Sequence, residues 1–144
     1  MIMQVALITG GGSGMGFAVA QKLVRENWLV AIVDLNEDDG LKAARDLGSN
    51  ASFVKANVVK YNEQLEAFEK TFTKHGRLDF VFANAGIAGL PDFYDKAKTW
   101  PPQPPSLLVQ HVNLTGVEYS AYLAMHYMRR NNEPGGVIII TASG

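Results

Sequence analysis

The chain has 144 residues, 47% of them apolar, with 13 basic and 14 acidic side chains and no cysteine. This length fits one domain, 1–144, and the balanced charge gives no electrostatic support for a nucleic-acid partner. The lack of cysteine excludes disulfides, thiolate chemistry and cysteine-bound zinc. No apolar run is long enough to span a membrane, and the N-terminus lacks the pattern of a secretion signal, so we expect a soluble cytoplasmic protein.

Short apolar runs alternate with helical patterns along the chain, which is typical of βαβ units in a parallel sheet. We therefore expect an α/β protein of the Rossmann type. Its doubly wound parallel sheet would lie in a three-layer α/β/α arrangement, truncated after the fifth strand. The predicted strands are residues 4–9, 28–34, 51–55, 78–83 and 137–141, and the predicted helices are 14–26, the segment between Asn36 and Gly48, 62–74 and 106–130.

Several residues suit the predicted helix ends. Asn36 and Ser106 can cap the helices that follow them, and Asn27, Gly48 and Gly76 suit helix C-termini. Residues 86–105 contain most of the prolines, which predicts a surface loop with one helical turn at 92–98.

A glycine-rich loop separates the first predicted strand from the first predicted helix. Backbone N–H groups at a helix N-terminus can bind pyrophosphate, and glycine lets the phosphates approach the backbone. The spacing fits neither GxGxxG nor GxxxxGK[ST], but it does fit TGxxxGxG; the alternative is a tight turn without a ligand. The residues assigned to this phosphate site are Thr9, Gly10, Gly12, Ser13, Gly14, Met15 and Gly16.

An acidic residue, Asp34, ends the second predicted strand. A carboxylate at this position can accept hydrogen bonds from both hydroxyls of an adenosine ribose and repels a 2′-phosphate. Neither Ser13 nor Leu35 offers a compensating positive charge, which favours NAD over NADP as the cofactor. The alternative is that Asp34 merely precedes the cap at Asn36.

With these motifs in order, the chain resembles the short-chain dehydrogenase/reductase family. The segment Ala83-Asn84-Ala85-Gly86 is similar to the family's Asn-Asn-Ala-Gly, which steadies the sheet and lines the cofactor site. Asn57-Val58 matches an Asp-Val pair whose acid meets the adenine amino group, a bond that Asn57 would accept through its amide oxygen. The resemblance thus adds Leu35, Asn57, Val58, Asn84, Ala85 and Gly86 to the expected NAD site.

The resemblance also implies two catalytic residues. Asn113 matches the family's asparagine that kinks the long helix and positions a water in the proton relay, although an ordinary helical asparagine is the alternative. Ser143 follows the last predicted strand and would hydrogen-bond the substrate carbonyl; the alternative is a serine that starts a turn. The run from Gly135 to Ile140, with Asp34, suggests the hydroxyprostaglandin dehydrogenase-like branch.

In this family a Tyr-x-x-x-Lys pair follows the serine by about a dozen residues, and the 144 residues contain no such pair after Ser143. Tyr94 and Lys98 match the spacing but precede Asn113 and lie in the proline-rich loop. We therefore expect the N-terminal, cofactor-binding half of an NAD-dependent oxidoreductase acting on an alcohol or ketone, inactive alone and homo-oligomeric when full length. The alternatives are a non-catalytic NAD-binding module and a fragment without a role; no metal site is expected.

Overall fold

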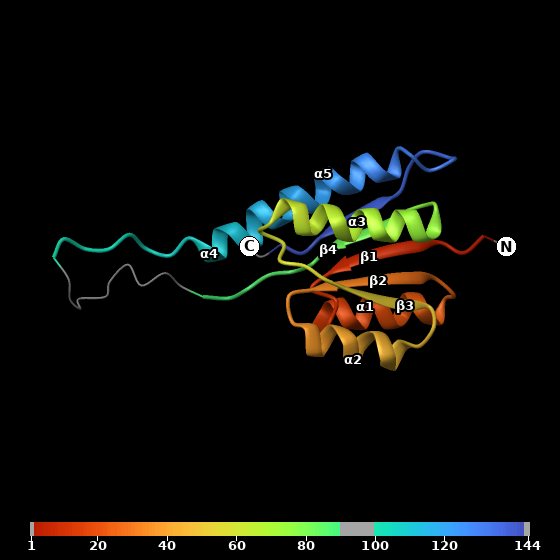
Figure 1. Ribbon diagram of the computed structural model, residues 1–144, viewed down its shortest axis with the longest axis horizontal. Helices are drawn as coiled ribbons and strands as arrows, with labels where there is room; N and C mark the ends of the chain where they lie inside the picture. The colour runs from red at the N-terminus through yellow and green to blue at the C-terminus, as the bar shows by residue number, and fades with distance from the viewer. Residues whose placement is uncertain (1, 90–99, 143–144) are drawn as a thin grey trace.

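The computed structural model describes residues 2–89 and 100–142, and its core is a five-stranded parallel sheet (Figure 1). The strands lie in the order β3-β2-β1-β4-β5, and every neighbouring pair is parallel. The strands are β1 (Val5–Thr9), β2 (Leu29–Asp34), β3 (Ala51–Lys55), β4 (Phe80–Ala83) and β5 (Val137–Ile140). The helices are α1 (Gly14–Arg25), α2 (Glu37–Leu47), α3 (Tyr61–His75), α4 (Leu108–Gln110), the π-helical turn η1 (His111–Thr115) and α5 (Gly116–Met128).

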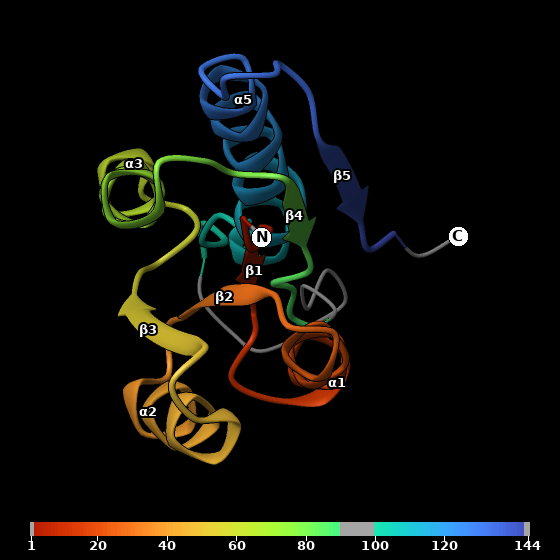
Figure 2. The same ribbon diagram turned by 90° about the vertical axis from the view of Figure 1, so that its right-hand side faces the viewer.

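Helices cover both faces of the sheet, which confirms the predicted three-layer Rossmann-type fold (Figure 2). All five residues of β1 are buried, and their side chains alternate between two cores. Val5 and Leu7 pack in the core that contains residues of α3 and α5, whereas Ala6 and Ile8 pack in the core that contains residues of α1 and α2.

Most of the predicted helix ends are confirmed. The side chain of Asn36 accepts a hydrogen bond from the backbone N–H of Asp39, which caps α2. Asn27 adopts a φ of 62° after α1, and Gly76 ends α3 in the left-handed conformation.

The long helix differs from its predicted form. It begins at Leu108 rather than at Ser106, and the Ser106 hydroxyl accepts from the Leu108 N–H at 3.3 Å. It is also interrupted by the π turn η1. Strand β4 begins at Phe80 rather than at residue 78, since the Leu78 N–H donates to the Asn131 side chain. The predicted turn at 92–98 lies outside the described residues.

The strand order places a reversal of winding between β1 and β4. From β1 the chain proceeds through β2 and β3 on one side, and then returns through α3 to add β4 on the other side. In an open α/β sheet, ligands bind in the crevice at the carboxyl ends of the strands at such a point. The loops after β1 and β4 are therefore the place to look for a site. Among the described residues, no helix is long and apolar enough to cross a membrane.

Candidate cofactor site

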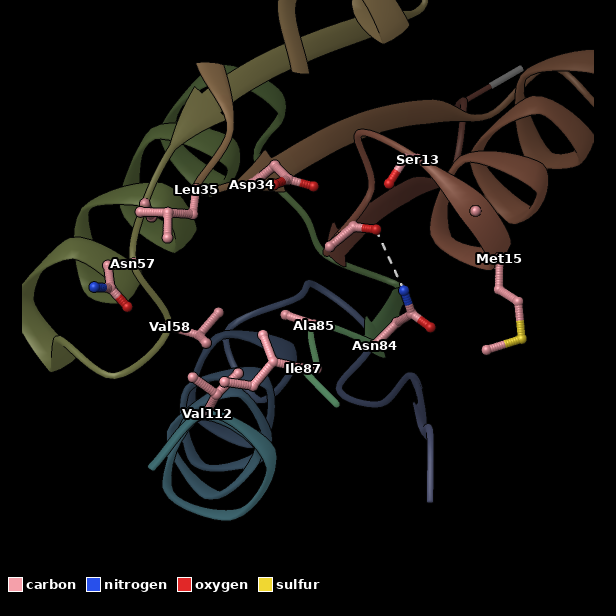
Figure 3. A pocket seen from close by; sticks show the side chains of 14 residues that line it. Ser13, Met15, Asp34, Leu35, Asn57, Val58, Asn84, Ala85, Ile87 and Val112 are labelled. Carbon is pink, nitrogen blue, oxygen red and sulfur yellow. Dashed lines mark hydrogen bonds between the residues drawn. The ribbon is translucent and has the colours of Figure 1, made fainter. Parts of the chain in front are cut away.

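The loop between β1 and α1 approaches neighbouring backbone too closely for side chains. Gly10 has a φ of 65°, and a Cβ there would lie 2.8 Å from the Ala85 Cα. A Cβ on Gly16 would clash with the carbonyl oxygen of Gly10. Ser13 precedes the first turn of α1, and its side chain makes no capping bond to that turn. Ser13, Gly14 and Met15 at the start of α1 line a cleft (Figure 3), so the free backbone N–H groups of this helix end are available to an anion there.

The carboxylate of Asp34 is held by two backbone N–H groups at the end of β2. Gly12 donates to its Oδ2 at 2.9 Å, and Asn36 donates to its Oδ1 at 3.0 Å. A Cβ on Gly12 would lie 2.9 Å from the same Oδ2, so a side chain there would displace the Asp34 carboxylate. The glycine loop thus orients the Asp34 carboxylate through the Gly12 N–H.

Thr9 and Asn84 join the ends of three strands. The buried Thr9 hydroxyl accepts from the backbone N–H groups of Asn84 and Ala85, at 3.1 and 3.2 Å. The Asn84 amide donates to the Gly10 carbonyl at 3.3 Å, the bond drawn in Figure 3, and accepts from the Thr141 hydroxyl at 2.8 Å. These bonds tie β4 to the glycine loop and to the segment after β5.

The opposite wall of the cleft follows β3. The backbone N–H of Asn57 donates to the Glu63 carboxylate at 2.7 Å, and this bond is the first cause that lowers the Glu63 pKa below its usual value. The Asn57 amide oxygen accepts from the Val59 N–H at 3.2 Å. The oxygen expected to meet adenine is therefore already held by the turn, with one lone pair left for a second donor.

These segments enclose a cleft of about 370 Å³, within the size range of small-molecule sites. We call it the glycine-loop cleft. Of the residues predicted for the cofactor site, Thr9, Gly12 and Gly16 do not line the cleft. Thr9 and Gly12 instead hydrogen-bond to the lining residues Asn84 and Asp34. Ala56, Ile87 and Val112 line it without having been predicted, although each directly neighbours a predicted residue in the sequence. The lining consists of Gly10, Ser13, Gly14, Met15, Asp34, Leu35, Ala56, Asn57, Val58, Asn84, Ala85, Gly86, Ile87 and Val112.

Asn113 lies within η1 and makes a reciprocal pair of bonds with one residue after β4. Its Oδ1 accepts from the Ile87 N–H, and its Nδ2 donates to the Ile87 carbonyl, both at 2.9 Å. Asn113 also lines a second hollow of about 410 Å³, which shares Asn84, Ala85 and Gly86 with the glycine-loop cleft. The irregularity predicted at Asn113 is thus a π-helical turn. Ser143, Tyr94 and Lys98 lie outside the described residues.

The sequence profile of a family described as "short chain dehydrogenase" matches residues 4–144. The chain belongs to the short-chain dehydrogenase family. The described part of this family member contains no group of three His, Asp or Glu side chains placed to hold a metal ion.

Two curated relatives illustrate the similarity. The short-chain dehydrogenase/reductase prx7 of Penicillium rubens is 39% identical over 138 residues, which cover 90% of this chain and 49% of the relative. The 3-hydroxyacyl-CoA dehydrogenase type-2 of Bos taurus is 36% identical over 148 residues, which cover 96% of this chain and 55% of the relative. The chain thus spans about half the length of these relatives.

A solved structure shares the fold. The 3-ketoacyl-(acyl-carrier-protein) reductase from Brucella melitensis, in complex with NADH, matches with a TM-score of 0.83 and 28% identity. The match covers 97% of this chain and 57% of the reductase chain. The comparison supports the Rossmann-type sheet with strand order 3-2-1-4-5.

Proposed function

We propose that residues 1–144 form the cofactor-binding half of an NAD-dependent oxidoreductase that acts on an alcohol or a ketone. The observation that carries this proposal is the Asp34 carboxylate, which Gly12 and Asn36 orient at the rim of the glycine-loop cleft. A carboxylate has lone pairs enough to accept two ribose hydroxyls in addition to these two N–H groups. When bound, NAD would accept a hydride from the alcohol or, as NADH, donate one to the ketone.

The residues of the cleft suit each part of NAD. The close approaches at Gly10 and Gly16 leave bare backbone where the pyrophosphate would lie, with the N-terminus of α1 beside it. Asp34 would bind the adenosine ribose, and Leu35, Asn57 and Val58 would flank the adenine. Asn84, Ala85 and Gly86 would flank the nicotinamide end, because they border both hollows.

Charge near Asp34 favours NAD over NADP. A 2′-phosphate at the ribose would meet the carboxylate of Asp34, and the first turn of α2 adds three more acidic residues. Lys55, the register partner of Asp34 on β3, donates to Glu37 at 2.9 Å, a bond that raises the Lys55 pKa. This cation therefore already has an acidic partner.

By the family resemblance, Ser143 would hydrogen-bond the substrate oxygen, and Asn113 would position a water in a proton relay. A Tyr-x-x-x-Lys pair outside residues 1–144 would exchange the proton, so we expect residues 1–144 alone to bind NAD without turnover. The same resemblance suggests a cytoplasmic homo-oligomer. Placement in the hydroxyprostaglandin dehydrogenase-like branch rests on the run from Gly135 to Ile140 and on Asp34, and stays a prediction.

Fluorescence titrations with NADH and NADPH test the cofactor proposal. We expect NADH to bind at least about tenfold more tightly than NADPH, since one desolvated charge conflict costs about 1.4 kcal/mol or more. Asp34→Ala should weaken NADH binding about 10- to 100-fold, because hydrogen bonds to a charged group are lost. It should also reduce the difference in affinity between NADH and NADPH.

The matched control is Asp46→Ala, which removes an exposed acid paired with Lys42 on α2 and should leave both affinities unchanged. Equal affinity for the two cofactors, or an Asp34→Ala variant with unchanged NADH binding, would contradict the proposal. Reduction of a ketone by residues 1–144 with NADH would overturn the expectation that this half is inactive alone.

A further inference from the structure

A buried amide outside the cleft has all of its hydrogen-bonding groups engaged. Gln64 lies in the first turns of α3 with a relative exposure of 0%. Its Nε2 donates to the Val58 carbonyl at 2.7 Å and to the Gly116 carbonyl at 2.8 Å. A buried glutamine is tolerated only when it is hydrogen-bonded in this way.

Ser120 completes the network from α5. Its buried hydroxyl oxygen lies 2.8 Å from Gln64 Oε1 and 2.9 Å from the Gly116 carbonyl oxygen. The hydroxyl has a single hydrogen, so it donates to one of these two acceptors at a time. Donation to Oε1 orients the Gln64 amide with both of its N–H groups towards the two carbonyls.

The two carbonyls belong to two segments that each contribute a residue to the lining of the glycine-loop cleft. Val58 lines the cleft after β3, and Gly116 follows directly on η1, which contributes Val112 to the lining. These two segments also pack closely against each other, since a Cβ on Gly116 would lie 2.8 Å from the Val58 Cγ2. Gln64 therefore joins the β3 wall to the helix that carries Asn113.

The hydrogen bond from Gln64 to Gly116 matters for the position of Asn113 because it lies at the end of the π-helical turn. In η1 the Gly116 N–H donates to the His111 carbonyl, five residues back, rather than to the residue four back. A return to α-helical spacing would rotate Asn113 relative to α5 and break its pair of bonds with Ile87. Bonds to Gly116, at the junction between η1 and α5, oppose that rotation.

We propose that Gln64 is a positioning residue, which holds the π turn so that Asn113 stays on Ile87 at the border of the cofactor cleft. The expected effect on NADH binding rests on the proposed NAD function. The proposal predicts that losing the Gln64 amide loosens η1 selectively, while the β1 core keeps its protection.

The test compares Gln64→Met with the wild-type chain by amide hydrogen exchange and by NADH titration. Methionine keeps the length and burial of the side chain but donates to neither carbonyl. We expect exchange at the Ile87 amide to accelerate about tenfold or more relative to the Leu7 amide of β1, because the opening is local. NADH affinity should fall about 3- to 10-fold, the size usual for a coupled site.

The matched control is Thr71→Val, on the same helix. The buried Thr71 hydroxyl donates to the Ala67 carbonyl of its own helix and, among the residues that the structure describes, bonds to no other element. This change also removes a buried hydrogen bond, so a general loss of stability would appear in both variants. With Thr71→Val, the ratio of Ile87 to Leu7 exchange and the NADH affinity should both stay at their wild-type values.

Two further variants keep the proposal testable if Gln64→Met fails to fold. Ser120→Ala leaves the Gln64 donors in place but removes the partner of Oε1, so Ile87 exchange should accelerate by a smaller factor, about 2- to 3-fold. Asn113→Ala removes the acceptor of the Ile87 amide, and in this background Ser120→Ala should cause no further acceleration at Ile87.

The outcomes separate this inference from the proposed function. If Ile87 and Leu7 accelerate equally in Gln64→Met and Ser120→Ala, Gln64 is only a structural amide and the positioning role is wrong. If the wild-type chain does not bind NADH, the cofactor proposal fails, whereas selective exchange at Ile87 would still support the hold on η1.

Discussion

At the scale of single residues, Asp34 shows how backbone geometry prepares a side chain for a ligand. Its two oxygens accept from the N–H groups of Gly12 and Asn36, so under the proposed function the carboxylate would need little reordering to meet a ribose. A Cβ at position 12 would crowd the Asp34 carboxylate at 2.9 Å. Gly12 therefore contributes directly to the placement of the Asp34 carboxylate.

His75 gives a prediction for pH dependence. Burial, with a smaller contribution from Lys74, lowers the His75 pKa in the folded protein below its ordinary value of 6.5. The folded state thus binds the proton less readily than the unfolded state, and protonation favours unfolding. The unfolding free energy should be highest above pH 6.5 and should fall as pH drops through the lowered pKa.

Urea unfolding between pH 7.5 and pH 5 measures this effect. His75→Gln should flatten the decline over that range, because the glutamine side chain does not titrate. Below this range Glu63, whose pKa is lowered, adds a loss of its own as it becomes protonated. A wild-type and a His75→Gln curve that run parallel from pH 7.5 to pH 5 would contradict the assignment.

At the scale of elements, α2 packs closely against β3 because Gly40 has no side chain. Gly40 is buried near the start of α2, and a Cβ there would enter the van der Waals surface of the Phe53 ring. Alanine is the better helix former by about 1 kcal/mol, so propensity alone predicts that Gly40→Ala stabilises the protein. Packing predicts the opposite sign.

We expect Gly40→Ala to lower the unfolding free energy by about 1–3 kcal/mol, as overpacking of a core usually does. Urea denaturation measures the change, and Phe53→Leu combined with Gly40→Ala should recover part of it by making room for the methyl group. A stabilised Gly40→Ala variant would show that β3 moves away from α2 at little cost.

At the scale of the whole molecule, the β5 edge of the sheet exposes apolar side chains. Strand β5 pairs with β4 on one side and, within the described residues, with no strand on the other. Val137, Ile139 and Ile140 are 54%, 47% and 47% exposed, unlike the fully buried β1. An apolar edge strand of this kind is a template for association.

Light scattering after size-exclusion chromatography should therefore show concentration-dependent association of the 144-residue chain. Ile139→Lys should reduce it, because a charge on an edge strand opposes pairing with a second edge. The control is Leu41→Lys, which places the same charge at a 42% exposed leucine of α2. Equal effects of the two changes would assign the association to net charge rather than to β5.

Much of the fold follows from local patterns. The alternation of apolar runs and helical stripes predicts the order of strands and helices, and Asn36 and Gly76 mark helix ends by their own conformational preferences. The helix start at Leu108 and the turn η1 are less predictable. At the start, the Leu108 N–H bonds to the Ser106 side chain. Within η1, Asn113 bonds to Ile87, which is distant in the sequence.

The sequence by itself determined the fold class, the glycine loop and the position of Asp34, since periodicity and spacing along one chain segment are sufficient for these. Only the tertiary structure decided which distant residues meet: Thr9 with Asn84, Ile87 with Asn113, and Gln64 with Gly116. The physical reason is that each of these hydrogen bonds joins groups far apart along the chain, and a parallel sheet with its covering helices is what brings them within bonding distance.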